Sequence, residues 1–194
     1  VNAYAESKTL AEREAWMILD SAGRHDDLAV INPNAIMGPL LDEDPGTSAG
    51  LIARLMAGGI PALPRLYFPM IDVRDVAAAH VRAMVVPWAG GHRFPMGEKT
   101  MSVLDVANGI VRHFKADVPV AVTGAFRVGD IRHNFADLSR IGGLTGFAPQ
   151  WAFGDGLAQF LSWAEGYAAG DAGFDRSLEE LKERGLMQSG PGQG

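Results

Sequence analysis

The sequence predicts an α/β fold, and two observations carry this prediction. An amphipathic helical pattern over about 7–22 is followed by Leu28-Ala29-Val30-Ile31, a continuous apolar run that is typical of a buried strand. Farther along, apolar runs that end at proline or aspartate again alternate with helical patterns. A parallel sheet covered by helices is built from this alternation. We therefore predict part of a parallel sheet with flanking helices, plus a smaller mixed lobe.

The other elements follow from apolar periodicity and turn residues. Ser48 is a good N-cap for a helix that ends at Gly58-Gly59, Asp72 or Asp75 is expected to cap the next helix, and Ser102 the one after that. We favour capping over ligand binding for Asp75. The expected strands and helices are as follows: strands over about 66–71, 92–96 and 117–122, a long loop over 34–47, and helices over about 76–86, 103–114, 135–141, 153–168 and 177–186.

The composition excludes several classes of function. The 194 residues carry a formal net charge of −6 with no run of lysine or arginine, so we expect neither a nucleic-acid nor a membrane partner. The chain has no cysteine, which is compatible with the cytoplasm and removes thiolate chemistry. The five histidines lack the spacing of a metal site, so no metal is expected. We expect a soluble cytoplasmic protein with a small-molecule partner.

The run Tyr4-Ala5-Glu6-Ser7-Lys8 contains the first candidate site. Residues four apart on a helix lie on the same face, so the polar ends of Tyr4 and Lys8 can share one ligand. An unperturbed phenol has a pKa of about 10, and a nearby ammonium favours the phenolate. The pair could therefore perform acid/base chemistry at a carbinol or carbonyl, although an ordinary amphipathic helix with an exposed lysine has the same pattern.

Several motifs in order make the sequence similar to a known family. Tyr4 and Lys8 on a helix, the strand end Asn32-Pro33, then Gly38-Pro39, and the run 71–77 before a helix resemble the C-terminal half of an extended short-chain dehydrogenase/reductase. This family includes NAD-dependent epimerases and dehydratases and dihydroflavonol-reductase-like enzymes. The resemblance implies the C-terminal part of a Rossmann-like parallel sheet with a small mixed α/β substrate lobe.

The resemblance also implies roles for individual residues. Tyr4 would exchange the substrate proton, and Lys8 would bind the nicotinamide ribose and lower the tyrosine pKa. Asn32-Pro33 resembles the strand end that meets the nicotinamide carboxamide, although a plain strand terminus explains it equally well. The loop that begins at Asn34 resembles the segment that contacts substrate.

A second signal, Arg127-Val128-Gly129-Asp130, lies in the C-terminal part of the chain and is followed by Arg132. It resembles the segment of nucleotide-sugar epimerases in which an arginine meets the substrate diphosphate. A guanidinium fork suits phosphate because it can bind two oxygens at once. Surface salt bridges from Arg127 and Arg132 to nearby aspartates are an equally good explanation. The substrate is therefore either a nucleotide sugar or a small carbonyl compound.

The cofactor implied by the resemblance is NAD or NADP in the intact parent enzyme. In this family a glycine-rich loop that binds the cofactor diphosphate precedes the tyrosine, and no Gly-x-Gly-x-x-Gly follows a strand in these 194 residues. We expect weak or no cofactor binding by this chain alone, and hence an enzyme fragment that is inactive alone. The alternative is a non-catalytic substrate-binding or interaction domain.

These inferences divide the chain into three parts. Residues 1–33 are expected to be a remnant of the Rossmann-like domain, with the catalytic helix and the following strand. Residues 34–187 are expected to form mostly the substrate-binding lobe, with Rossmann elements returning at about 66–95, and 188–194 a disordered tail. Helices left without their strands would expose apolar area, so we also expect a homo-oligomer.

Overall fold

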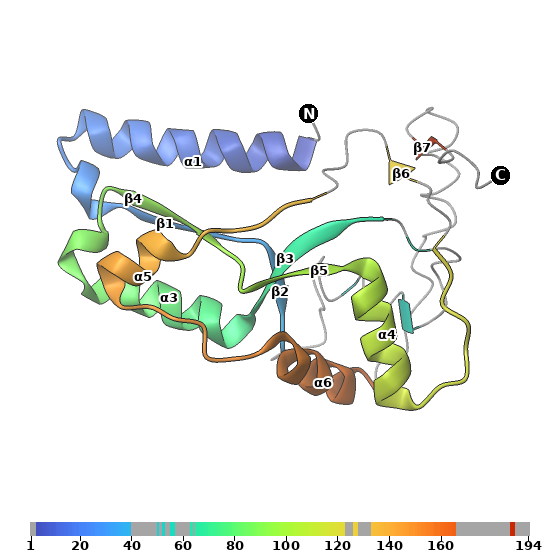
Figure 1. The fold of residues 1–194 in the computed structure, drawn as a ribbon. Helices are drawn as coiled ribbons and strands as arrows, with labels where there is room; N and C mark the ends of the chain where they lie inside the picture. Colours follow the sequence, from blue (N-terminus) through green and yellow to red (C-terminus); the bar gives the residue numbers. More distant parts are fainter. Residues whose placement is uncertain are drawn as a thin grey trace.

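The computed structural model describes residues 3–39, 50, 52, 55–56, 63, 65–122, 126–127, 133–165 and 187–188. These residues form short strands flanked by helices, which confirms the α/β prediction (Figure 1). Helix α1 (Ala3–Ser21) lies on one side of the strands β1 (Ala29–Pro33) and β4 (His92–Met96), and α3 (Val73–Val85) lies on the other. None of the described helices is long and apolar enough to cross a membrane.

The chain passes twice from the two-stranded sheet of β1 and β4 to a second sheet of three strands. β1 pairs in parallel with β4, and after Asn34 the chain continues as β2 (Ala35–Met37), which pairs in parallel with β3 (Tyr67–Asp72). β4 is likewise followed by β5 (Lys99–Ser102), which pairs antiparallel with β3. The sequence did not predict β2 or β5. Both short strands pair with β3, one on each side of it.

Gly97, between β4 and β5, allows the segment 133–138 to pass close to β3. A Cβ at this position would lie 2.4 Å from Pro69 Cβ and 3.2 Å from Ala136 Cβ. Only a residue without a side chain therefore fits between β3 and the segment 133–138. The close approach carries that segment across the carboxyl end of β4.

The start of α3 separates the roles of its two aspartates. Asp72 is the N-cap, because its side chain accepts a hydrogen bond from the Arg74 backbone N at 2.9 Å. The N-cap expected at Asp75 is wrong. Asp75 is 1% exposed, and its carboxylate accepts hydrogen bonds from the backbone N of Gln150 at 2.9 Å and of Trp151 at 3.1 Å. Asp75 lies within the first turn of α3, where its carboxylate holds the turn that leads into α6.

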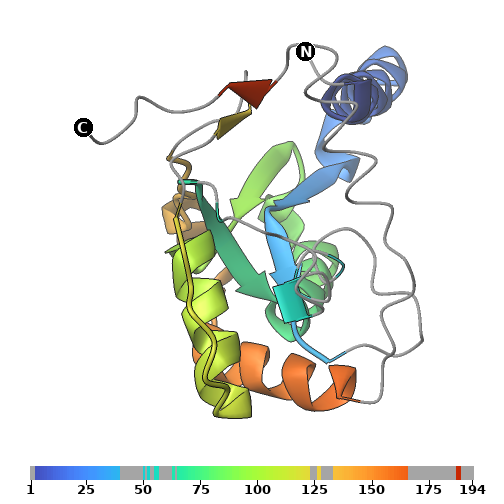
Figure 2. The same cartoon turned by 90° about the vertical axis from the view of Figure 1, so that its right-hand side faces the viewer.

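Three further helices complete the described fold: α4 (Val103–Phe114), α5 (Ser139–Thr145) and α6 (Phe153–Ala164). Ser102 caps α4 as predicted, in a capping box with Asp105. α4 and α6 lie side by side at one end of the molecule (Figure 2). A buried apolar cluster joins them to β2 and β3, and its large members are Met37, Ile52, Met70, Val106, Ile110, Leu157, Phe160 and Leu161.

Some sequence predictions are wrong in position. The strand expected over 117–122 is reduced to one bridge, in which Val122 meets Leu63. The helix expected over 135–141 lies instead at α5, because Asp137 bonds the Ser139 backbone N at its start. Gln188, expected in the tail, lies in β7 (Met187–Gln188), which pairs with β6 (Phe126–Arg127). Of the helix expected from Ser48, residues 50, 52, 55 and 56 are described, and they are helical as predicted. Ser48 itself and the helix expected over 177–186 lie outside the described residues.

Candidate active site

Tyr4 and Lys8 lie next to each other on the first turns of α1. The Lys8 Nζ is 5.5 Å from the centroid of the Tyr4 ring, within the range of a cation–π contact. The Tyr4 side chain is 66% exposed. Ser7 does not join this pair, because its hydroxyl donates a hydrogen bond to the Tyr4 backbone carbonyl at 2.7 Å. The phenol and the ammonium therefore share one exposed helix face, as the four-residue spacing predicts.

Helix α1 runs antiparallel to β1, so its first turns lie over the carboxyl end of that strand (Figure 1). The Glu12 carboxylate fixes this position: it accepts a hydrogen bond from Asn32 Nδ2 at 3.0 Å and an ion pair from Arg93 Nε at 2.7 Å. The hydrogen bond from Arg93 holds the pKa of Glu12 below its usual value. Tyr4 is eight residues before Glu12, about 12 Å along the helix axis. The pair is therefore carried past Asn32, beyond the strand end.

Asn32 has an unusual side chain. Its Nδ2 bonds Glu12, but its Oδ1 is buried and has no hydrogen-bond partner in the part of the chain that the structure describes. A buried acceptor without a donor is costly, on the order of 1–3 kcal/mol. Pro33 follows it and pairs in register with Met96 of β4. The strand end therefore holds a polar atom that a bound donor could satisfy.

Asn34 ties three segments together beyond the strand end. Its Oδ1 accepts a hydrogen bond from Asn134 Nδ2 at 3.2 Å, and its backbone N bonds the Met96 carbonyl at 3.0 Å. The Thr100 hydroxyl in turn donates to the Asn134 carbonyl at 3.1 Å. The sequence did not single out Asn134 or Thr100, because neither is in a recognisable motif. Asn134 does follow the Arg-x-Gly-Asp motif, which is the signal that could have found it.

Aromatic groups border this polar cluster. The rings of Tyr67 and His133 are 4.7 Å apart, and the Phe135 side chain is 80% exposed. Such rings can cover an apolar or planar part of a ligand. The segments beyond the carboxyl end of β1 therefore carry amide, hydroxyl and aromatic groups.

The two arginines proposed for the substrate diphosphate cannot be compared with this cluster. Arg127 lies in β6, whose backbone is described without its side chains, and Arg132 lies outside the described residues. The structure thus brings Asn34 together with Asn134, and it leaves the two arginines as a prediction. Among the described residues, no group of three or more His, Asp or Glu side chains could hold a metal ion.

Known proteins with similar sequences are reductases and epimerases. No family model matches the chain. The chain is 34% identical over 137 residues to the NADPH-dependent methylglyoxal reductase of Saccharomyces cerevisiae, which covers 64% of this chain and 40% of that protein. It is 40% identical over 88 residues to tetraketide alpha-pyrone reductase 2 of Arabidopsis thaliana, and this match covers 45% of this chain and 27% of that protein. It is 35% identical over 94 residues to dTDP-L-rhamnose 4-epimerase of Burkholderia thailandensis, and this match covers 48% of this chain and 26% of that protein.

Solved structures give the same fold. UDP-glucose 4-epimerase of Thermus thermophilus in complex with NAD superposes with a TM-score of 0.68 at 20% identity, over 85% of this chain and 54% of that one. Yeast methylglyoxal/isovaleraldehyde reductase in complex with NADPH superposes with a TM-score of 0.60 at 24% identity, over 81% of this chain and 53% of that one.

The relatives to which the chain is similar are reductases and epimerases of the extended short-chain dehydrogenase/reductase family. The chain spans about half or less of the length of each of these relatives and structural neighbours. The motifs from Tyr4 onward had indicated this family.

Proposed function

We propose that this chain supplies the proton-transfer pair and part of the substrate site of an NAD(P)-dependent oxidoreductase or nucleotide-sugar epimerase/dehydratase. The observation that carries the proposal is the contact between Tyr4 and Lys8 on the helix face above the carboxyl end of β1. Ligands of open α/β sheets bind at the carboxyl ends of the strands. The pair is therefore where proton transfer to a bound substrate would be needed.

Each member of the pair has a separate task. When the substrate carbonyl is reduced, the Tyr4 phenol donates its proton to the carbonyl oxygen, and the reverse reaction returns it. The Lys8 ammonium stabilises the resulting phenolate and holds the cofactor ribose. A bound nicotinamide supplies or accepts the hydride at the substrate carbon. A reductase uses this chemistry once, and an epimerase uses it in both directions.

The residues at the strand end fit a nicotinamide. The carboxamide of that group carries an N–H donor, and the buried Asn32 Oδ1 is an acceptor without a partner among the described residues. Asn32 and Pro33 would hold the nicotinamide end. The glycine-rich loop that binds the diphosphate has no counterpart in the 194 residues. In calorimetric titrations of this chain, we expect no binding of NAD or NADPH at micromolar concentration, and a micromolar dissociation constant would contradict this expectation.

The open edge of β1 is the place where a cofactor-binding part of the fold would pack. Among the described residues β1 pairs only with β4. β1 and α3 also border an open pocket of about 790 Å³, whose lining combines apolar side chains such as Leu28, Ile31 and Met84 with charged ones near residues 24–27. Met84 is 85% exposed. A further parallel strand with its helix would cover these groups.

The polar cluster beyond the strand end would contact the substrate. Asn34, Asn134 and Thr100 offer amide and hydroxyl groups that suit either a sugar or a small carbonyl compound. If the substrate is a nucleotide sugar, Arg127 and Arg132 would bind its diphosphate. The cytoplasm is the proposed location, because the chain has no cysteine.

A chimera tests the proposal. This chain would replace the aligned part of the yeast NADPH-dependent methylglyoxal reductase, which supplies the rest of the fold. The purified chimera would be assayed with NADPH or NAD against small aldehydes and ketones, and against UDP- and dTDP-sugars. We expect turnover with one of these two substrate classes. A folded chimera that binds NADPH but turns over neither class would contradict the proposal.

The alternative role, a non-catalytic interaction domain, is supported by the exposed apolar side chains of α1. Leu10, Met17 and Ile18 are each more than half exposed on this helix. Such a surface favours self-association. Size-exclusion chromatography with light scattering distinguishes the two roles in part, because a sharp monomer peak with cooperative melting would count against an assembly function.

A further inference from the structure

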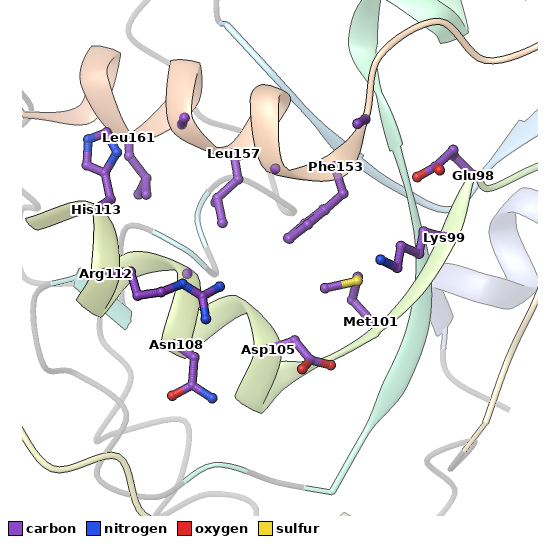
Figure 3. A pocket seen from close by; sticks show the side chains of 14 residues that line it. Glu98, Lys99, Met101, Asp105, Asn108, Arg112, His113, Phe153, Leu157 and Leu161 are labelled. Carbon is purple, nitrogen blue, oxygen red and sulfur yellow. The ribbon is translucent and has the colours of Figure 1, made fainter.

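A second pocket lies between α4, α6 and β5, apart from the candidate active site (Figure 3). Its volume is about 600 Å³, and no residue of α1 or β1 lines it. Pockets of this size hold small organic molecules. Its position is therefore independent of the proposed proton-transfer site.

The floor of this pocket is apolar. Phe153 and Leu157 point into it from α6, and Met101 faces them from β5 (Figure 3). Gly109 on α4 lets the two helices approach, because a Cβ there would lie 2.7 Å from Leu157 Cδ2. Because the helices are in close contact at Gly109, these apolar side chains form the bottom of the pocket, and its opening lies above them.

Two cations, Lys99 and Arg112, line the rim of the pocket. In the part of the chain that the structure describes, the side chains of Lys99 and Arg112 form no hydrogen bond and no ion pair within 4.0 Å. Figure 3 shows the Arg112 guanidinium reaching toward the middle of the pocket, across from Leu157. Arginine binds a carboxylate through two parallel hydrogen bonds.

Of the other charged groups in the lining, Asp105 interacts with both cations through its charge, and hydrogen bonds from Ser102 together with the charges of Lys99 and Arg112 lower its pKa. The Asp105 carboxylate accepts hydrogen bonds from the Ser102 hydroxyl at 2.7 Å and the Ser102 backbone N at 2.9 Å. His113 faces Glu165 at 3.6 Å at the far end, and Glu98 is exposed at the other end. Arg112 is thus the charged group that a ligand on the apolar floor would meet.

We propose that this pocket binds a small amphipathic carboxylate, with the carboxylate on Arg112 and Lys99 and an alkyl or aryl body on Phe153 and Leu157. The apolar side chains of Phe153 and Leu157 and the two cations, whose N–H groups are not hydrogen-bonded to other described side chains, match the two ends of such a molecule. This inference does not depend on the proposed enzymatic function.

The test is an NMR titration of the full 194-residue chain with octanoate, and with octylammonium as the probe of opposite charge. Octanoate is expected to shift the resonances of Met101, Leu157 and Leu161 to saturation, and octylammonium is not. The double variant Lys99→Gln, Arg112→Gln should weaken octanoate binding about tenfold, since it removes two charge-assisted contacts. The matched double variant Arg65→Gln, Arg140→Gln changes two exposed arginines outside the pocket and should leave the affinity unchanged.

Three results would overturn the proposal: no saturable shift at these residues, equal binding of octylammonium, or unchanged octanoate affinity in the Lys99→Gln, Arg112→Gln variant. Thermal unfolding of each variant separates lost binding from lost structure. If the double variant unfolds early, Arg112→Lys gives a second measurement. It keeps the charge and removes the planar fork, and it should weaken octanoate binding about threefold.

Discussion

Helices α1 and α3 cover opposite sides of the same strands, but they are attached in different ways. The start of α3 is held by buried, fully bonded carboxylates. Asp72 forms two 2.7 Å contacts with the Arg74 guanidinium, which also bonds Gln159 and lies 3.3 Å from the Trp151 ring centroid. By contrast, no residue of α1 is buried, and Glu12 provides its main bonds to the strands.

Buried hydrogen bonds therefore stabilise the region around α3 and α6. The helix that carries Tyr4 and Lys8 is instead attached through a few polar contacts. Buried, bonded carboxylates are expensive to disturb, whereas exposed ion pairs contribute little. The candidate catalytic pair is therefore on the less firmly held of these two helices.

Asp75→Ala should have the largest effect on stability. The substitution leaves the backbone N–H groups of Gln150 and Trp151 without their acceptor, so we expect a loss of about 3 kcal/mol in the free energy of unfolding. Urea unfolding measures this loss. The exposed control Asp117→Ala should change stability by less than about 0.5 kcal/mol. A loss no larger than that of the control would remove the contrast between the two helices.

Arg74→Lys should have the next largest effect. Lysine keeps the charge near buried Asp72 but cannot form the paired contacts or the stack on Trp151. We expect a loss of about 1.5 kcal/mol in urea unfolding and a change in Trp151 fluorescence. Arg140→Lys, at an exposed site, is the matched control. An equal stability in both variants would show that the fork geometry does not matter.

Glu12→Ala should release α1 alone. It removes the acceptor for Asn32 and Arg93, at a cost of about 1 kcal/mol. Amide hydrogen exchange should then lose protection over α1, and protection of α4 and α6 should not change. Glu14→Ala, on the same helix and exposed, is the control. If α4 and α6 lose protection together with α1, then the helix is a cooperative part of the framework.

The smallest expected effect is a pH dependence of the local stability of α1. The pKa of Glu12 is lowered from 4.5 by Arg93, so its contribution is present above pH 4.5 and is lost as pH falls through the lowered value. The pKa of His25 is raised from 6.5 by its hydrogen bond to Asp20, so its contribution is present below pH 6.5 and is lost as pH rises through the raised value.

Protection factors of the α1 amides should consequently be highest between about pH 4.5 and 6.5. Asp20→Asn should remove the decline at higher pH and leave the decline at lower pH. A profile of α1 that is flat over this range would show that neither group contributes.

Local patterns in the sequence predicted the elements that depend on their own residues. Apolar periodicity gave α3, α4 and α6, and the spacing of four placed Tyr4 beside Lys8. β2 and β5 were missed because strands of three and four residues are defined by their pairing with β3.

The candidate site shows the same limit. Asp72 and Asp75 look alike as helix caps in the sequence, and only the fold brings residues 150–151 to Asp75. Asn34 and Asn134 are 100 residues apart and meet through the crossing at Gly97. Contacts of this kind arise from tertiary structure and leave no local pattern.

The central claim is that Tyr4 transfers the proton, and the most direct measurement of it is the effect of Tyr4→Phe on kcat in the chimera with the yeast reductase. We predict a fall of at least about 100-fold, with cofactor binding retained, because the ring remains and only the hydroxyl is lost. Ser7→Ala, on the same turns of α1, should keep its full rate. Equal rates for Tyr4→Phe and Ser7→Ala would contradict the account.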